Sequence, residues 1–142
     1  MKDSRFNFRK IFIFLLANLL SHNVLATCYV AKNFKGTGYA SVNGYSAEKD
    51  GMLGKVFHIN INKTEASVVP DPGTSCLPMS DIIMVCTGGI DDEITNMEIY
   101  SIDKRQKKVV YVQIRNGLEA ALLSDLNGGK IFIGDIIGTC NK

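Results

Sequence analysis

Short apolar segments and turn-forming residues alternate along most of the chain of 142 residues. The apolar segments are rich in Val, Ile, Tyr and Phe, which favour β-strands, and Gly with Asn or Asp separates them. This pattern predicts strands at Cys28–Phe34, Gly38–Asn43, Lys55–Asn62, Ala66–Val69, Asp81–Thr87, Met97–Asp103, Lys108–Arg115 and Lys130–Ile137. Many short strands at close spacing are typical of a barrel or sandwich. We therefore expect a mainly β fold, a small antiparallel meander of one of these two kinds.

Two of these segments alternate with a period of two residues. Phe57, Ile59 and Ile61 share one face of their segment, and the polar residues share the other. In the segment 108–115, one face carries Val110, Val112 and Ile114, and the other carries Val109, Tyr111, Gln113 and Arg115. Such alternation indicates antiparallel strands with one face in water. The segments 82–85 and 131–133 are apolar on both faces, which predicts central or covered strands.

Other segments interrupt the β pattern. Residues 118–126 are rich in helix formers and precede Asn127-Gly128, a pair suited to ending a helix, so they predict the one short helix of the fold. Residues 43–54 have the composition of an irregular loop.

The first 26 residues have the pattern of a cleaved secretory signal peptide. Basic residues extend to position 10, an apolar run follows from Ile11 to Leu20, and Val24 and Ala26 suit the positions before a cut. The run is shorter than the roughly 20 residues of a membrane span. No later stretch is long enough to span either, so we expect no stable membrane insertion. Residues 27–142 are then a single exported domain.

Cleavage after Ala26 changes the charge and the cysteine chemistry of the chain. The formal net charge of the whole sequence is +2, and the removed segment carries four basic residues and one acidic residue, so the remainder has a net charge of −1. Residues 25–28 also resemble a bacterial lipobox, in which Cys28 would be acylated. Thr27 departs from that motif, and acylation would leave an odd number of cysteines, so we prefer Cys28 as half of a disulfide.

The four cysteines all follow the predicted cleavage site. An even number of cysteines in a small exported domain indicates two disulfides, and three pairings are possible. The preferred pairing joins Cys28 to Cys140 and Cys76 to Cys86. Cysteine and histidine spacings typical of zinc sites are missing, so no metal or other cofactor is expected. Disulfides further indicate the periplasm or the extracellular space.

Two charged segments are candidate binding loops. Asp91, Asp92 and Glu93 place three carboxylates together, either for a cation or as a solvated acidic loop. Lys104, Arg105, Lys107 and Lys108 form a basic run, either for an anionic partner or as a hairpin turn whose charges oppose edge pairing.

Catalysis has little support in the sequence. His58 is the only histidine after residue 26, and serine-hydrolase and zinc-protease motifs are missing. We expect His58 to lie on a solvated strand face. Asp135, within an apolar strand, would need a second acid for glycosidase chemistry. Neither a basic excess nor interleaved aromatic residues indicate a nucleic-acid partner. We therefore expect no enzyme.

Three functions fit these observations. The first is an exported protein-binding module, for example an inhibitor or immunity-type protein, whose partner is another protein of the envelope or extracellular space. Its binding residues would lie in the loops 43–54, 70–79 and 88–96. The alternatives are a small-ligand carrier of the β-barrel type and a carboxylate-dependent hydrolase. Bulky Phe57, Ile59 and Ile61 favour a filled core over a carrier cavity. The partner's identity and the oligomeric state stay open.

Overall fold

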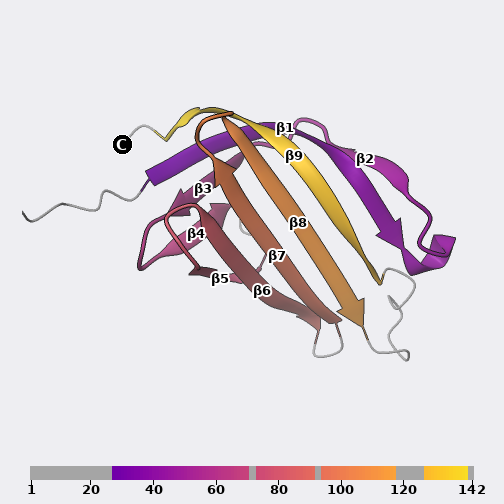
Figure 1. Cartoon of the computed structure of the whole chain (residues 1–142). Helices are drawn as coiled ribbons and strands as arrows, with labels where there is room; N and C mark the ends of the chain where they lie inside the picture. The colour runs from indigo at the N-terminus through magenta and orange to yellow at the C-terminus, as the bar shows by residue number, and fades with distance from the viewer. Residues whose placement is uncertain (1–26, 71–72, 92–93, 118–126, 141–142) are drawn as a thin grey trace, which may run out of the picture.

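The computed structural model of the protein describes residues 27–70, 73–91, 94–117 and 127–140 (Figure 1). This part of the chain contains one 3-10 turn, η1 (Ser41–Asn43), and nine strands: β1 (Thr27–Ala40), β2 (Glu48–Met52), β3 (Phe57–Ile61), β4 (Ala66–Val69), β5 (Ser75–Pro78), β6 (Ile83–Asp91), β7 (Ile94–Asp103), β8 (Lys108–Gly117) and β9 (Gly128–Thr139). The predicted mainly β, antiparallel fold is confirmed. The predicted signal segment 1–26 and helix 118–126 lie outside the described residues.

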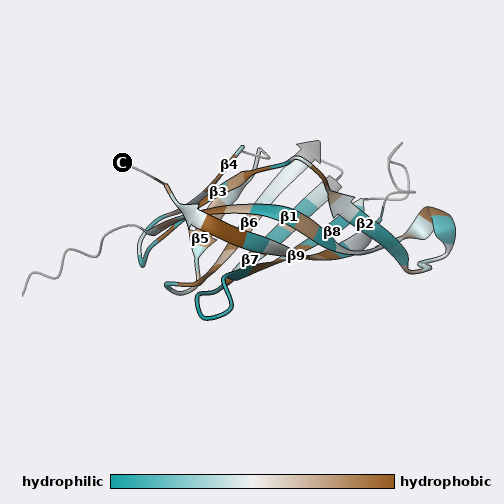
Figure 2. Ribbon diagram, turned by 90° about the horizontal axis from the view of Figure 1, so that it is seen from above, coloured by the Kyte–Doolittle hydropathy of each residue, from teal (hydrophilic) through white to brown (hydrophobic). Residues whose placement is uncertain are grey.

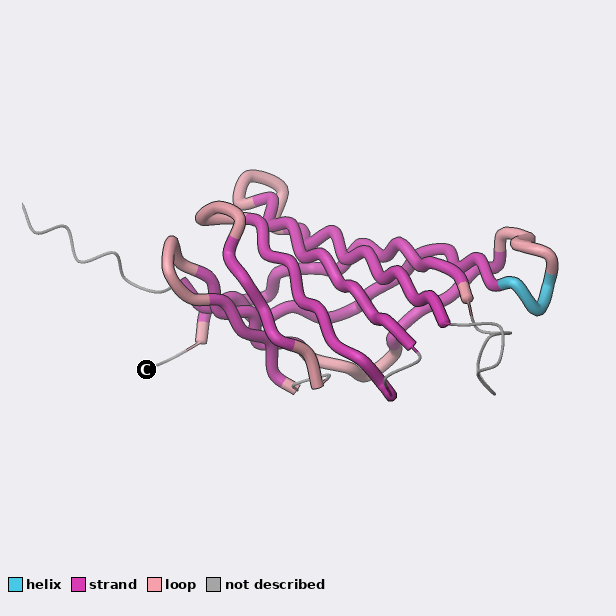
Figure 3. The backbone as a smooth tube through the Cα atoms, turned by 90° about the horizontal axis from the view of Figure 1, so that it is seen from below, coloured by secondary structure: helices cyan, strands magenta, loops and turns pink. Residues whose placement is uncertain are grey.

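The sheet is a meander that curls into a nearly closed barrel. Its strand order is β4-β3-β1-β9-β8-β7-β6-β5, and every pairing is antiparallel. The first and last strands pair with each other, and β4 and β5, at the two ends of this order, lie side by side (Figure 3). β1 pairs with β9 along one edge, and it is long enough to pair with two further strands along the opposite edge. Thr27–Ala31 pairs with β3, and Phe34–Gly38 pairs with β2.

Aromatic side chains fill the inside of the barrel. The rings of Phe34 and Phe57 meet edge to face with centroids 5.1 Å apart, and Tyr111 stacks on Phe132 at 5.8 Å. Ile59 and Ile61 lie beside them and are almost fully buried, which confirms the predicted inward face of β3. Such burial supplies most of the driving force for folding, since each large apolar side chain contributes about 1.5–3 kcal/mol.

Both predicted disulfides are present, Cys28–Cys140 and Cys76–Cys86. The first joins the beginning of β1 to the residue after β9, and the second joins β5 to β6 across one register position. Disulfides persist in oxidising compartments, so the protein belongs outside a reducing cytosol. Within the described residues, no helix has the length and hydropathy needed to cross a membrane.

Two segments predicted as loops contain strands. β2 lies within 43–54 and β5 within 70–79. β2 contains Glu48, Lys49 and Asp50, which disfavour strands, but its backbone pairs with the open edge of β1. β5 is short and is attached to β6 by a disulfide as well as by pairing. Most of the third predicted loop, 88–96, belongs to the ends of β6 and β7.

The predicted break between residues 34 and 38 is also wrong, because β1 continues from Thr27 to Ala40. Its pairing with β9 shifts register between Lys32 and Lys35, where a bulge bends the strand without ending it. The glycines that suggested a turn lie against β9. A Cβ at Gly36 would overlap the carbonyl oxygen of Ile131, so this position needs glycine for close approach, whereas a Cβ at Gly38 would make only ordinary contacts with the Lys130 side chain.

Alternation along β8 leaves open which of its two faces is inside, and the structure decides it. Val109 and Tyr111 are buried, so the face that also carries Gln113 and Arg115 points into the barrel, and the wholly apolar face points outward. The segments 82–85 and 131–133 were expected in central or covered strands, and β6 and β9 do lie between two neighbouring strands each, but neither is covered on both faces. Met84 and Phe132 are buried, but Ile131 and Ile133 are about half exposed, at 50% and 52%. The barrel therefore combines a partly polar interior with a partly apolar exterior.

Candidate functional site

The basic run predicted as a binding loop forms the turn between β7 and β8. The side chains of Lys104, Arg105 and Lys107 are exposed, and Asp103 Oδ1 accepts hydrogen bonds of 2.9 Å from the backbone N–H groups of Arg105 and Gln106. Lys108 is different, because it is half-buried and its Nζ lies 2.6 Å from Asp135 Oδ1. Three of the four basic side chains are thus free to meet an anionic partner, and the fourth holds β8 against β9. Their predicted binding role stays a prediction.

The predicted acidic loop is at the β6–β7 connection. Asp91 is the last residue of β6, whereas Asp92 and Glu93 lie outside the described residues. The interpretation of this loop as a cation or partner site stays a prediction.

Asp135 has two partners, Lys108 and Asn33. Asn33 Nδ2 donates to Asp135 Oδ2 at 3.1 Å. The hydrogen bond from Lys108, supported by that from Asn33, lowers the pKa of Asp135 below its usual 3.8. These partners are one reason why Asp135 is tolerated in an otherwise apolar strand. Neither partner is an acid, so they do not supply the second carboxyl group that glycosidase chemistry needs.

The lowered pKa of Asp135 predicts a pH dependence. Because the folded pKa lies below the unfolded value, this carboxylate stabilises the fold above about pH 4, and the contribution is lost as the pH falls through the folded pKa. We expect an NMR titration to place the Asp135 midpoint below 3.8, and Lys108→Gln to move it upward. Lys104→Gln, a neighbouring charge without this contact, should leave the midpoint unchanged. An unmoved midpoint in Lys108→Gln would contradict the assignment.

His58 lies on the exposed face of β3, as predicted from its alternation. Its Nδ1 is 3.5 Å from Cys140 Sγ, although 82 residues separate the two. Cys28, His58 and Cys140 place their ligand atoms within 4.8 Å of one another, a juxtaposition that sequence spacing did not reveal. Both sulfurs belong to the disulfide, so they are not thiolate ligands for a metal.

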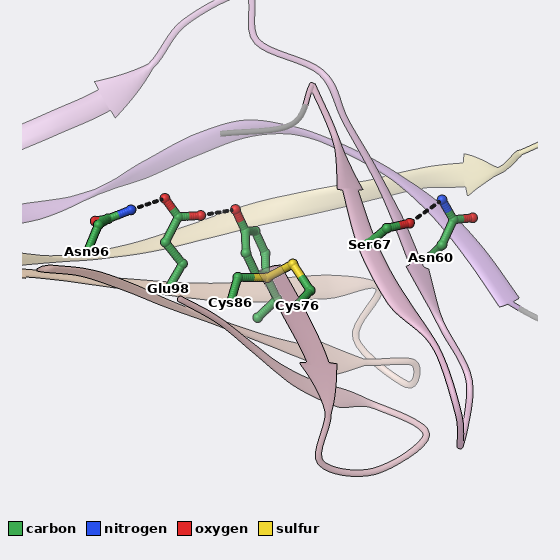
Figure 4. The surroundings of a disulfide bond; sticks show 7 residues. Asn60, Ser67, Cys76, Cys86, Asn96 and Glu98 are labelled. Atoms are coloured by element: carbon green, nitrogen blue, oxygen red, sulfur yellow. Dashed lines mark hydrogen bonds between the residues drawn. A yellow bond between two sulfur atoms is a disulfide. The ribbon is translucent and has the colours of Figure 1, made fainter. Parts of the chain in front are cut away.

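The buried carboxylate of Glu98 is the centre of a polar cluster inside the barrel. Its side chain is only 3% exposed. Glu98 Oε1 accepts from Asn96 Nδ2 at 3.0 Å, and Oε2 accepts from the Tyr100 hydroxyl at 2.7 Å (Figure 4). Oε1 also accepts from Gln113 Nε2 at 3.4 Å. The cluster comes from β7 and β8, where Glu98 and Gln113 are directly opposite in register. Three donors thus compensate the cost of burying this carboxylate.

Glu98 also keeps the neighbouring tyrosines protonated. Burial raises the pKa of Tyr100 and of Tyr111 well above the usual 10, and the negative charge of Glu98 raises both further. Both hydroxyls are therefore neutral donors at any physiological pH. They can donate hydrogen bonds but do not supply a phenolate base.

A cleft of about 560 Å³ opens beside this cluster, and we call it the polar cleft. Its walls are Asp50, Gly51, Met52, Leu53, Lys55, Phe57, Glu98, Tyr100, Tyr111, Gln113, Arg115, Lys130 and Phe132. A smaller hollow of about 220 Å³ adjoins it and shares Asp50, Gln113, Arg115 and Lys130. Lys130 passes close to Gly38 and pairs with Asp50 at 2.7 Å, so β9 is joined to β2 across β1. This volume suits a small organic ligand.

A second candidate surface is on the outside of the sheet. Five aliphatic side chains occupy one register row across five adjacent strands, and we call them the outer apolar row: Leu77, Val85, Ile99, Val112 and Ile131. Leu77 is 66% exposed and Ile131 50% exposed, while the three between them are half-buried. Ile133 and Ile114 flank the row on β9 and β8. Hydrophobic segments, brown in Figure 2, recur along several strands of the sheet.

Sequence reasoning placed neither the polar cleft nor the outer apolar row. A signal for the row was available, because three of its strands carry aliphatic residues on both faces. For the segments 82–85 and 131–133 that pattern predicts central or covered strands, and for the segment 108–115 it predicts one face in water, so it does not single out an apolar outer face. Glu98 gave no signal, since it alternates with Ile99 and Met97 as an ordinary solvent-facing residue would. Comparison with protein-family models, curated proteins and solved structures finds no match to this chain.

Proposed function

We propose that this protein is an exported protein-binding module and that the outer apolar row is its binding surface. The observation that carries the proposal is the row itself, five aliphatic side chains in register with exposed members at both ends. Contiguous apolar surface of this kind is uncommon on soluble monomers and usually marks an interaction site.

The dimensions of the row suit a protein partner. Adjacent strands lie about 4.8 Å apart, so four steps from Leu77 to Ile131 span roughly 19 Å. Covering apolar surface contributes about 25 cal/mol per Å², and the centre of an interface is typically apolar. The row continues from Ile131 to Thr37 on β1 and from there to Lys49 on β2. A second lysine, Lys35 on β1, lies opposite Ile133 of β9. A partner with an apolar centre and acidic groups at one rim would complement this face.

The compartment supports the same proposal. Two disulfides indicate an oxidising environment, and the predicted signal peptide would deliver the domain there. Its partner would then be a protein of the envelope or extracellular space, as for an inhibitor or an immunity-type protein. A rigid cross-linked sheet suits this function because little conformational entropy is lost on binding.

Substitution of Ile131 tests the proposal. A partner that the wild-type protein retains at a fixed stoichiometry from its native envelope or medium should bind Ile131→Lys at least tenfold more weakly by calorimetry. An unpaired lysine charge covered by an apolar partner costs more than the roughly 1.4 kcal/mol that a tenfold change represents. Val42→Lys is the matched control, because Val42 is exposed on η1 outside the row. Equal affinities of wild type and Ile131→Lys would refute the proposal. So would sedimentation showing that a second copy covers the row.

The polar cleft favours a second candidate function, a small-ligand carrier. The cleft volume lies within the usual range of ligand sites, and the cleft combines aromatic walls with a few polar groups. A small molecule that stays with the purified protein, with an unchanged affinity in Ile131→Lys, would favour the carrier over the binding module.

A further inference from the structure

We propose that the polar cleft binds a small organic acid, with the carboxylate on Arg115 and an apolar body against the aromatic wall. This site goes beyond the proposed protein-binding function, because it lies on the inner face of the sheet whose outer face carries the outer apolar row. Four observations carry the assignment: the unpartnered donor of Arg115, the occupied oxygens of Glu98, the aromatic wall and the charge of the lining.

Arg115 has an unused hydrogen-bond donor. Its Nε is buried and has no acceptor, and within the described part of the chain no carboxylate lies at ion-pair distance from its guanidinium. A buried donor without a partner costs about 1–3 kcal/mol, so a ligand that supplies an acceptor gains that amount on binding. Carboxylate is the group whose two oxygens match the guanidinium fork.

Glu98 does not compete with a ligand as the acceptor for the Nε–H of Arg115. Both of its oxygens already accept hydrogen bonds, from Asn96, Gln113 and Tyr100. The same three donors make Glu98 a poor site for a ligand cation, because a cation would have to displace or share them. Among the buried polar side-chain atoms of the described residues that line the cleft, the unpartnered one is therefore the Nε donor of Arg115.

The aromatic wall defines the rest of the ligand. Phe57, Tyr111 and Phe132 line the cleft, and Met52 and Leu53 from β2 and the residue after it line its other side. Leu53 is 98% exposed, so it has apolar surface available to cover a ligand. An aryl or short alkyl group attached to the carboxylate would fit between these side chains.

The charges of the lining favour a monoanion. Three cationic residues, Lys55, Arg115 and Lys130, and two anionic residues, Asp50 and Glu98, face the cleft. The excess is one positive charge, which a single carboxylate neutralises. A dianion such as phosphate would leave an uncompensated negative charge beside buried Glu98.

Three probes with the same phenyl group and similar length test the site: 3-phenylpropionate, its neutral amide, and 3-phenylpropylamine. We expect the acid to bind with a Kd near or below about 1 mM, as its size allows, and about tenfold more tightly than the amide. The Nε–H signal of Arg115 in a ¹⁵N-labelled sample should shift more at saturation with the acid than with the amide, because the carboxylate is the charged acceptor. Arg115→Gln should remove the preference for the acid.

The controls separate this site from other effects. Lys63→Gln removes one positive charge on the exposed β3–β4 turn, away from the cleft lining, and should leave the affinity for the acid unchanged. Thermal unfolding shows whether Arg115→Gln folds, and Arg115→Lys, which keeps the charge without the fork, should bind with intermediate affinity. Ile131→Lys should not affect the titration, which keeps this test independent of the protein-binding proposal.

Any of four results would overturn the proposal: equal affinity for acid and amide, tighter binding of the amine, retention of the acid preference in Arg115→Gln, or no binding of the acid at 10 mM, about tenfold above the expected Kd.

Discussion

Replacing Cys28 and Cys140 together by alanine should lower the melting temperature by about 15 °C. This disulfide joins residues 112 positions apart, so it closes nearly the whole described chain into one loop. The chain-entropy relation assigns a loop of that length about 4.8 kcal/mol of stability. The bond also holds the beginning of β1 beside the end of β9, the pairing that closes the barrel.

The second disulfide supplies the matched comparison. Cys76 and Cys86 are 10 positions apart, for which the same relation gives about 2.8 kcal/mol. Cys86 is fully buried, so alanine there also loses packing. We expect calorimetry to show that the Cys28/Cys140 double variant loses more unfolding free energy than the about 2.8 kcal/mol that the relation assigns to the short loop. A reducing agent should lower the melting temperature of the wild type. A change of under 3 °C in the Cys28/Cys140 double variant would contradict the expectation.

Gly134→Ala should destabilise the protein by about 1–3 kcal/mol through overpacking. A Cβ at Gly134 would lie 2.7 Å from ring carbons of Phe34. That ring is almost fully buried and contacts Phe57 and Tyr111 edge to face, so it has little room to move aside. Chemical denaturation measures the loss, and Gly134→Val should cost more.

Gly138→Ala is the control in the same strand, because no heavy atom lies within 4 Å of the position of its added Cβ. It should be close to neutral. Phe34→Leu should partly rescue Gly134→Ala, so the double variant should lose less stability than the two single losses added together. Additive losses would show that the ring contact is not the cause.

Strands whose own residues indicate both the strand and its buried face were predictable from the sequence. Phe57, Ile59 and Ile61 alternate strictly, and any sheet that covers one face of β3 must cover that one. β4 has the bounds that its composition predicted. β2 and β5 were not predictable, because their pairing depends on edges that β1 and β6 offer only after folding. Their own residues have weak strand propensity, and partner strands override such preferences.

The candidate surfaces depend still more on the tertiary structure. Alternation along β8 shows which side chains share a face, but both faces carry aliphatic residues, so it does not show which face is inside. Register decides that question, since Tyr111 lies between Tyr100 and Phe132 in one inward row. The same register places Gln113 beside Glu98 and aligns Leu77 with Ile131 four strands away.

The sequence by itself determined a mainly β, antiparallel domain with cysteines for two disulfides, because strand propensity, period-two alternation and cysteine number are local or compositional properties. The tertiary structure decided which cysteines pair, and it confirms the preferred pairing. The prediction of export rests on such properties too, and it stays a prediction. Only the tertiary structure decided where the polar cleft and the outer apolar row lie. Both arise from side chains on different strands, and closure of the barrel by β1 and β9 selects which face of each strand meets water.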